Sequence, residues 1–141
     1  MNDLAYDKPL PEPSAVSRPY WDALREHRLV LQCCRQCHTV RHYPRPVCDR
    51  CYSMDYEWIP ASGRGTVHSW STYHHPFHFA FKRDMPYVVL TVDLEEGVRL
   101  QAPLRGADAS ALEIGAPVEV VFEDATDEIT LPAFRLVRTN G

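Results

Sequence analysis

The apolar residues of this chain are spaced as in a helix near the N-terminus and alternate as in strands beyond about residue 60. In "SRPYWDALREHRLVLQ" the apolar side chains fall roughly on one helical face. They are Tyr20, Trp21, Leu24 and Leu29. Because Ser17 and Pro19 are typical of a helix start, we expect a short helix over about 19–27.

The strand pattern begins after the turn signal "SGRG". "TVHSWSTYHH" alternates, which predicts that Val67 and Trp70 lie on opposite faces of one strand. "YVVLTVDL" resembles a buried strand, and "EEG" predicts a hairpin turn into "VRLQAPL". "PVEVVF" and "LPAFRLVR" predict two more strands, with a helical turn closed by Gly115 between "VRLQAPL" and "PVEVVF". A strand is also expected to begin near Trp58 and Ile59.

Five strands in about 80 residues favour a small closed or half-closed barrel. Residues 1–17 contain three prolines and few apolar side chains, so we expect a flexible arm there. The predicted organisation is an arm over 1–17, a helix and cysteine segment over 18–60, and a barrel over 61–141.

The charge of the chain is mildly negative, with 15 Lys and Arg against 19 Asp and Glu. Residues 25–50 hold six arginines but two acidic residues, whereas seven basic and eleven acidic residues follow residue 60. The first twenty residues lack an apolar signal region, and no later run approaches the roughly 20 apolar residues of a membrane span. We therefore expect a cytoplasmic protein with reduced thiols and no membrane segment.

All five cysteines lie between residues 33 and 51. Cys34 with Cys37 and Cys48 with Cys51 form two Cys-x-x-Cys pairs, separated by ten residues. Two such turns can supply a tetrahedral four-sulfur shell, and a closed shell favours a structural zinc over a catalytic one.

Other interpretations of the cysteines stay open. Iron fits the same shell, and Cys33 could replace Cys34 at a less usual spacing. A redox site would be expected in a βαβ setting, and disulfides do not suit a reducing compartment. His38 and His42 are interpreted as bystanders.

Six segments in this order resemble the DUF35 family over about residues 18–138. They are "YWDALREHRLVLQCCRQC", "PRPVCDRC", "WIPASGRGTVHSWS", "PYVVLTVDLEEGVRL", "IGAPVEVVF" and "LPAFRLV". The resemblance implies a mainly β protein: an N-terminal helix and rubredoxin-like zinc ribbon, then a five-stranded OB-fold barrel. Its metal ligands carry over onto Cys34, Cys37, Cys48 and Cys51.

The same resemblance implies a non-catalytic accessory subunit of a thiolase-superfamily enzyme. The partner would be a thiolase or retro-aldolase acting on acyl-CoA thioesters, in steroid or fatty-acyl side-chain degradation. A CoA thioester would lie at the shared interface. An enoyl-CoA hydratase is the alternative partner.

Two groups of residues are candidates for contact with the partner or with acyl-CoA. The first is a loop rich in histidine and aromatic residues, with His74, His75, Phe77 and His78. The second is the charged pair Arg64 and Arg83, which could meet CoA phosphates. The competing interpretations are a solvated loop packing its phenylalanines on the barrel, a second metal at the histidines, and ordinary surface arginines.

The sequence departs from the family at the residue after each Cys-x-x-Cys pair. Glycine is usual there because a positive φ is needed, whereas this chain has His38 and Tyr52. We expect the metal site to survive, with a strain on the order of 1 kcal/mol at Tyr52.

Two other functional classes are alternatives for this sequence. Zinc ribbons and OB folds also bind single-stranded nucleic acid, but the acidic balance of the barrel half argues against it. An enzyme in its own right would need a nucleophile with a positioned base, and no such motif stands out. Cys33 could be reactive if nearby arginines lower its pKa, but an incidental thiol is the favoured interpretation.

Overall fold

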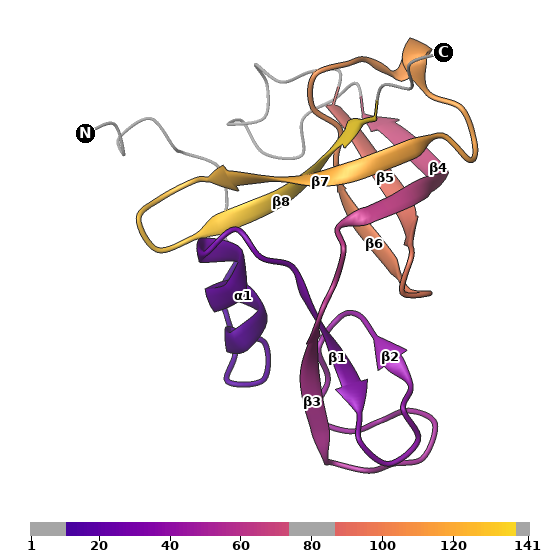
Figure 1. Cartoon of the computed structure of the whole chain (residues 1–141). Coiled ribbons are helices and arrows are strands. Elements are labelled where there is room, and N and C mark those ends of the chain that lie inside the picture. The colour runs from indigo at the N-terminus through magenta and orange to yellow at the C-terminus, as the bar shows by residue number, and fades with distance from the viewer. Residues whose placement is uncertain (1–10, 74–86, 138–141) are drawn as a thin grey trace.

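Two antiparallel sheets and one α-helix make up the regular structure of the described residues, 11–73 and 87–137, in this computed structural model (Figure 1). The smaller sheet has the order β2-β1-β3 and the larger β6-β5-β4-β7-β8. The elements are α1 (Arg18–Arg25), β1 (Val30–Cys34), β2 (Val40–Arg41), β3 (Tyr56–Pro60), β4 (Arg64–Tyr73), β5 (Tyr87–Leu94), β6 (Arg99–Pro103), η3 (Ala109–Ala111), β7 (Pro117–Asp124) and β8 (Thr130–Leu136).

Helix α1 confirms the predicted helix and ends two residues earlier. Pro19 lies in its first turn, but the Ser17 side chain makes no capping hydrogen bond to the helix. Ser17 Oγ instead accepts from the backbone N–H of Ser14 at 2.9 Å. After the helix, His27 has φ 57°, and this left-handed backbone conformation ends the helix and turns the chain away from the helix axis.

Strand β1 at the centre of the smaller sheet was missed from the sequence. All five of its residues are buried, so it shows no alternation that would distinguish it from the end of a helix. Strand β3 begins at Tyr56, two residues before the predicted start at Trp58. The cysteine segment is therefore a three-stranded sheet carrying two turns.

The larger sheet closes into the predicted barrel. Its edge strands meet where Leu104, just after β6, forms a parallel bridge with Phe134 of β8, and the Arg105 N–H donates to the Phe134 carbonyl at 2.8 Å. Gly97 has φ 90° in the turn between β5 and β6, as the "EEG" hairpin signal predicts. This strand order, with its parallel closure, is that of the OB-fold barrel.

The prediction that Val67 and Trp70 lie on opposite faces of β4 was wrong. The pairing of β4 with β5 shifts register between Val67 and Ser69, leaving His68 as the extra residue of a β-bulge. Because a bulge moves the following side chains to the other face, half-buried Trp70 packs on the same core as Val67. Strand β5 also differs from the prediction: it is buried on one face, and the other is half-exposed.

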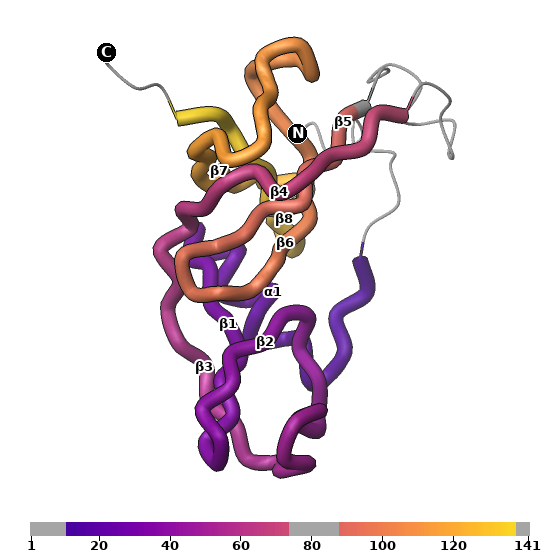
Figure 2. Tube along the Cα trace, turned by 90° about the vertical axis from the view of Figure 1, so that its right-hand side faces the viewer, coloured from indigo at the N-terminus to yellow at the C-terminus, as the bar shows by residue number. Residues whose placement is uncertain are grey.

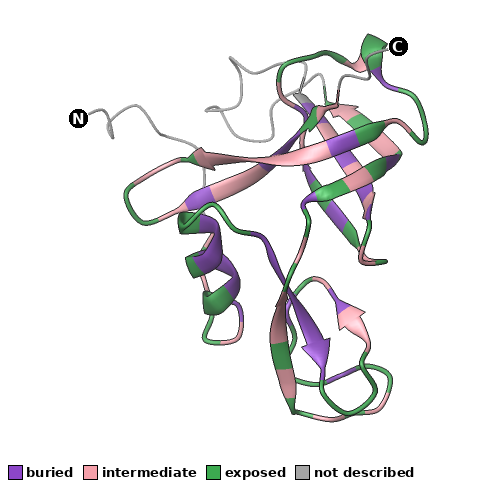
Figure 3. Ribbon diagram, viewed as in Figure 1, coloured by how far each residue is buried: buried purple, intermediate pink, exposed green. Residues whose placement is uncertain are grey.

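One hydrophobic core joins the helix, the smaller sheet and the barrel. Tyr20, Trp21 and Leu24 of α1 and Leu31 of β1 belong to the same buried cluster as the barrel residues. Figure 3 shows buried segments on α1, on β1 and on the barrel strands. The division of the chain at residues 17 and 60 stays a prediction. Among the described residues, no helix has the length and apolar character needed to cross a membrane.

Candidate metal centre and neighbouring surfaces

Four cysteine thiols converge at the end of the smaller sheet. Cys34 ends β1, Cys37 lies in the turn that follows, and Cys48 and Cys51 lie in a second turn before β3. Their four sulfurs lie within 4.8 Å of one another, with Cys34 to Cys51 at 3.5 Å and Cys37 to Cys48 at 3.7 Å. Because zinc–sulfur bonds of about 2.3 Å in a tetrahedron place sulfurs about 3.8 Å apart, these thiols fit one metal ion.

The two turns repeat the same backbone hydrogen bonds. The N–H of His38 donates to the Cys34 carbonyl at 2.9 Å, and the N–H of Tyr52 donates to the Cys48 carbonyl at 2.9 Å. In each turn the first thiol also accepts a backbone N–H, from Cys37 at 3.5 Å or from Arg50 at 3.4 Å. Both turns are therefore shaped to present thiolates to a shared ion.

These N–H donors change the acidity of the thiols. The Cys37 N–H is the main cause that lowers the pKa of Cys34 to about 6, and the Cys51 N–H does most to lower the pKa of Cys48. The pKa of Cys51 is raised to about 12: the Ser53 N–H lowers it, but burial and the neighbouring thiols outweigh that donor. Four thiolates this close repel one another, so a cation is needed to hold all four deprotonated.

The residues that follow each cysteine pair have the left-handed backbone expected from the sequence. His38 has φ 64° and Tyr52 has φ 63°. Tyr52 is 78% exposed, so its ring gains little from packing in return for this conformation. Both turns thus adopt the left-handed conformation although neither has glycine at this position.

Replacing Tyr52 with glycine is expected to stabilise the metal-loaded protein by about 0.5–1 kcal/mol. The left-handed penalty of about 1–2 kcal/mol is removed, and the added freedom of glycine in the unfolded chain costs about 0.5–1 kcal/mol. Denaturant unfolding would measure this. The control is Met54→Gly, a 72% exposed residue without positive φ, which should destabilise. A loss of stability in both variants would contradict the interpretation that the backbone of Tyr52 is strained.

Cys33 and the two nearby histidines lie outside the four-thiol group. Cys33 is buried, and burial is the main cause that raises its pKa, with Arg41 opposing. This favours the incidental thiol over a reactive one. His42 packs against the Tyr20 ring at 5.3 Å, and burial lowers its pKa to about 4, as suits a neutral packing residue.

Most of the predicted contact residues lie outside the described part of the chain. They are His74, His75, Phe77, His78 and Arg83. The exception is Arg64 at the start of β4, whose guanidinium pairs with Glu95 at 3.2 Å and is 64% exposed.

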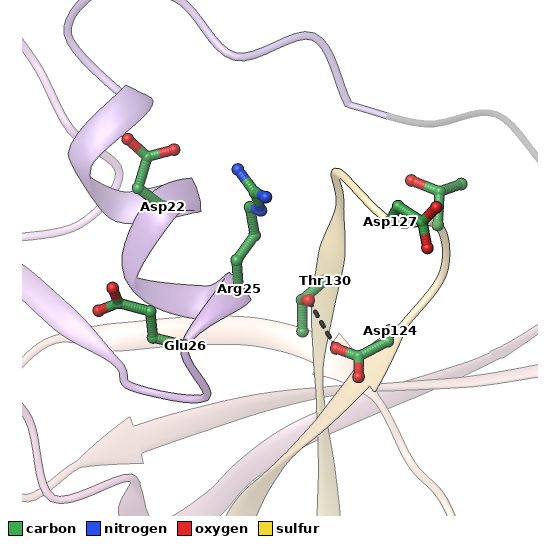
Figure 4. Close-up of a pocket in the computed structure, with 7 residues that line it drawn as sticks. Asp22, Arg25, Glu26, Asp124, Asp127 and Thr130 are labelled. Carbon is green, nitrogen blue, oxygen red and sulfur yellow. Dashed lines mark hydrogen bonds between the residues drawn. The ribbon is translucent and has the colours of Figure 1, made fainter.

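A polar cavity of about 580 Å³ lies between α1 and the far end of the β7–β8 hairpin (Figure 4). Its lining residues are Asp22, Arg25, Glu26, Asp124, Thr126, Asp127 and Thr130. In this lining, Asp124 accepts from the Thr130 hydroxyl at 2.7 Å and also contacts His27 Nε2 at 2.9 Å.

This His27–Asp124–Thr130 group has the wrong order for nucleophilic catalysis. A catalytic triad places the imidazole between the hydroxyl and the carboxylate, whereas here the carboxylate lies between the other two. Thr130 is also buried, and His27 stacks on Phe122 with ring centroids 5.2 Å apart. The Thr130 hydroxyl first and then His27 lower the pKa of Asp124. The group therefore fastens the end of the helix to the barrel.

The outward-facing side chains of residues 88–94 and 99–103, on β5 and β6, form no aromatic platform for nucleic-acid bases. Three cross-strand pairs point away from the core there: Val89 with Pro103, Thr91 with Gln101, and Asp93 with Arg99. Over residues 88–94 and 99–103 no aromatic side chain is present, and Arg99 is paired with Asp93 at 2.9 Å. Single-strand binding uses stacking aromatics among basic residues, so this face argues against it.

Two family models match adjoining parts of the chain. Residues 21–57 match "ChsH2, rubredoxin-like zinc ribbon domain", and residues 58–123 match "ChsH2, C-terminal OB-fold domain". The boundary between them falls in β3, where the smaller sheet leads into the barrel.

Sequence relatives include an enzyme subunit and a scaffold protein. The chain is 42% identical over 128 residues to the "Probable enoyl-CoA hydratase alpha subunit" of Thermomonospora curvata, covering 91% of this chain and 40% of that protein. It therefore spans about two fifths of that relative's length. It is 38% identical over 105 residues to the "DUF35 domain-containing scaffold protein" of Methanothermobacter thermautotrophicus, covering 74% of this chain and 78% of that protein.

A solved structure named "Ltp2-ChsH2(DUF35) aldolase" contains a similar chain. The TM-score is 0.81 at 42% identity, and the match covers 90% of this chain and 98% of that one. The likeness therefore extends over the ribbon and the barrel together.

Proposed function

Because the chain belongs to the DUF35 family of zinc-ribbon and OB-fold proteins, we propose that it is a non-catalytic accessory subunit of an enzyme acting on acyl-CoA thioesters. The partner we propose is a thiolase-superfamily enzyme of the thiolase or retro-aldolase type, in the cytoplasm. The acyl group, a steroid side chain or a fatty-acyl chain, is inferred from the family resemblance.

One observation carries the proposal. The alignment covers 98% of the length of a chain in the structure named "Ltp2-ChsH2(DUF35) aldolase", at 42% identity. A likeness over both the ribbon and the barrel supports the same kind of assembly for this chain, because the whole surface framework is shared. The scaffold name of the archaeal relative agrees with a supporting role.

We propose that the metal is zinc, with Cys34, Cys37, Cys48 and Cys51 as its ligands and iron as the alternative. Zinc in a closed four-thiolate shell supplies folding energy and no open position for chemistry. The reacting groups would then come from the partner. Two observations support a chain without reacting groups of its own. The carboxylate lies in the middle of the His27–Asp124–Thr130 group, unlike in a catalytic triad, and the pKa of Cys33 is raised.

A hydratase partner is the second candidate. The hydratase name of the Thermomonospora relative favours it, although the chain spans 40% of that relative. Both partners would bring a CoA thioester to the interface, so they differ in reaction and not in the role of this chain. His74, His75, Phe77, His78, Arg64 and Arg83 remain our proposed contact residues.

Affinity purification from the native cell tests the proposal. We expect a tagged chain to bring down one thiolase-superfamily protein in a stoichiometric complex, and a His74→Ala/His75→Ala/Phe77→Ala variant to retain metal but recover less partner. The matched control is Ile114→Ala, at an exposed apolar residue shortly before β7. A stoichiometric hydratase would favour the second candidate. A chain purified alone or with nucleic acid would contradict both.

A further inference from the structure

A basic cleft separates the ribbon from the barrel. In both views the β5–β6 turn of the barrel lies beside β2 of the ribbon (Figures 1 and 2). The two surfaces border an open cavity of about 450 Å³, lined in part by four arginines and two aspartates. They are Arg41, Arg45, Arg50, Arg99, Asp49 and Asp93.

The aspartates neutralise half of these arginines. Arg45 pairs with Asp49 at 2.8 Å, and Arg99 pairs with Asp93 at 2.9 Å. Within the described residues, Arg41 and Arg50 have no carboxylate partner. Two arginines without a carboxylate partner therefore line one cleft from the ribbon side.

Arg41 is the more unusual of the two because it is 5% exposed. Its Nε donates to Gln32 Oε1 at 2.5 Å, its Nη2 donates to the Arg45 carbonyl at 3.1 Å, and its guanidinium lies 5.5 Å from the Tyr56 ring centroid. All these partners are uncharged, and Nη1 is buried with no partner among the described residues. A buried cation without an anion is costly, so a nearby anion would stabilise it.

Hydrogen bonds within the ribbon hold the Arg41 side chain in place before any ligand binds. Gln32 Oε1 accepts from Arg41 and also from the Arg45 N–H at 2.9 Å, which ties β1, β2 and the following turn together. Guanidinium groups bind the oxygens of phosphate in a two-pronged arrangement, and a concave basic surface concentrates anions. Arg45 and Arg99, both about half-exposed, can turn from their aspartates toward such an anion.

We propose that this ribbon–barrel cleft binds the phosphate group of a small molecule, held by the exposed side chains of Arg50 and Arg99, with the buried charge of Arg41 behind them. The inference goes beyond the proposed function, because it concerns a ligand of this chain alone and needs no partner.

Titration calorimetry of the whole metal-loaded chain with inorganic pyrophosphate tests the site. Arg50→Gln and Arg99→Gln are the test variants, since both side chains lie on the surface of the cleft. Each is expected to weaken binding about tenfold, from the loss of a charge-assisted contact. The control is Arg35→Gln, an exposed ribbon arginine outside the cleft, which should change the affinity less than twofold.

Two results would overturn the proposal. One is no binding of pyrophosphate or coenzyme A by the unaltered chain. The other is an equal loss in Arg50→Gln and Arg35→Gln, which would indicate general charge attraction.

Comparing coenzyme A with pyrophosphate shows whether the bound phosphate belongs to a nucleotide or is a free anion. Tighter binding of coenzyme A than of pyrophosphate, lost in Arg50→Gln, would support a nucleotide ligand. Equal affinity, also lost in Arg50→Gln, would support a free anion.

Discussion

Removing the metal by chelation is expected to unfold the ribbon turns while much of the barrel sheet persists. In the described chain between residues 35 and 55, the only buried residues are Arg41, Pro44 and Cys48, so apolar packing cannot hold these turns. Structural zinc sites contribute about 10–16 kcal/mol of apparent binding free energy. That is comparable to the roughly 5–15 kcal/mol by which whole domains are stable, so the turns should be lost with the metal.

Metal analysis and amide hydrogen exchange would measure this effect. Cys34→Ala and Cys51→Ala should lose stoichiometric metal and exchange protection in the ribbon. Cys33→Ala is the matched control, because this neighbouring thiol lies outside the four-sulfur group and should leave the metal content unchanged. Full metal occupancy in Cys34→Ala or Cys51→Ala would contradict the ligand assignment.

Truncating Phe134 to alanine is expected to destabilise the protein by about 3–5 kcal/mol, the range for a large aromatic side chain in a core. Phe134 is fully buried where β8 meets Leu104 and closes the barrel, and it belongs to the cluster that includes Tyr20 and Leu24 of the helix. The cavity left by this substitution would therefore weaken both the contact that closes the barrel and the packing of the helix against it.

Denaturant unfolding with metal bound would measure the loss at Phe134. Ile114→Ala, at a residue 68% exposed, should change the free energy of unfolding by less than about 0.5 kcal/mol. Similar values for the two variants would show that Phe134 does not support the core as described.

Local signals predicted the elements that depend on neighbouring residues. The helix start at Pro19, the hairpin turn at Gly97 and the left-handed positions at His38 and Tyr52 all follow from backbone preferences of short segments. The sulfurs of the four cysteines lie close together, an arrangement that two short turns can produce whatever the rest of the chain does.

Features that depend on distant contacts could not be predicted in this way. Strand β1 has no alternation because it lies between β2 and β3 and all five of its residues are buried, with Leu31 in the core shared with the helix and the barrel. The bulge at His68 depends on how β4 registers with β5. The cleft around Arg41 exists only because the β5–β6 turn meets the ribbon, and arginine spacing carries no sign of it.

The shared core also bears on function. Since α1, β1 and the barrel pack in one cluster, the metal centre and the barrel are held together as parts of one framework. A subunit of this kind can order a partner over a broad surface without supplying a reacting group, which is the role that we propose.

The most direct test of that role is turnover of a β-hydroxyacyl-CoA by the co-purified partner, measured for the chain alone, the partner alone and the two together. The account predicts no turnover by the chain alone and faster turnover by the complex than by the partner alone. Turnover by the chain alone, or equal rates for the partner with and without it, would contradict the account.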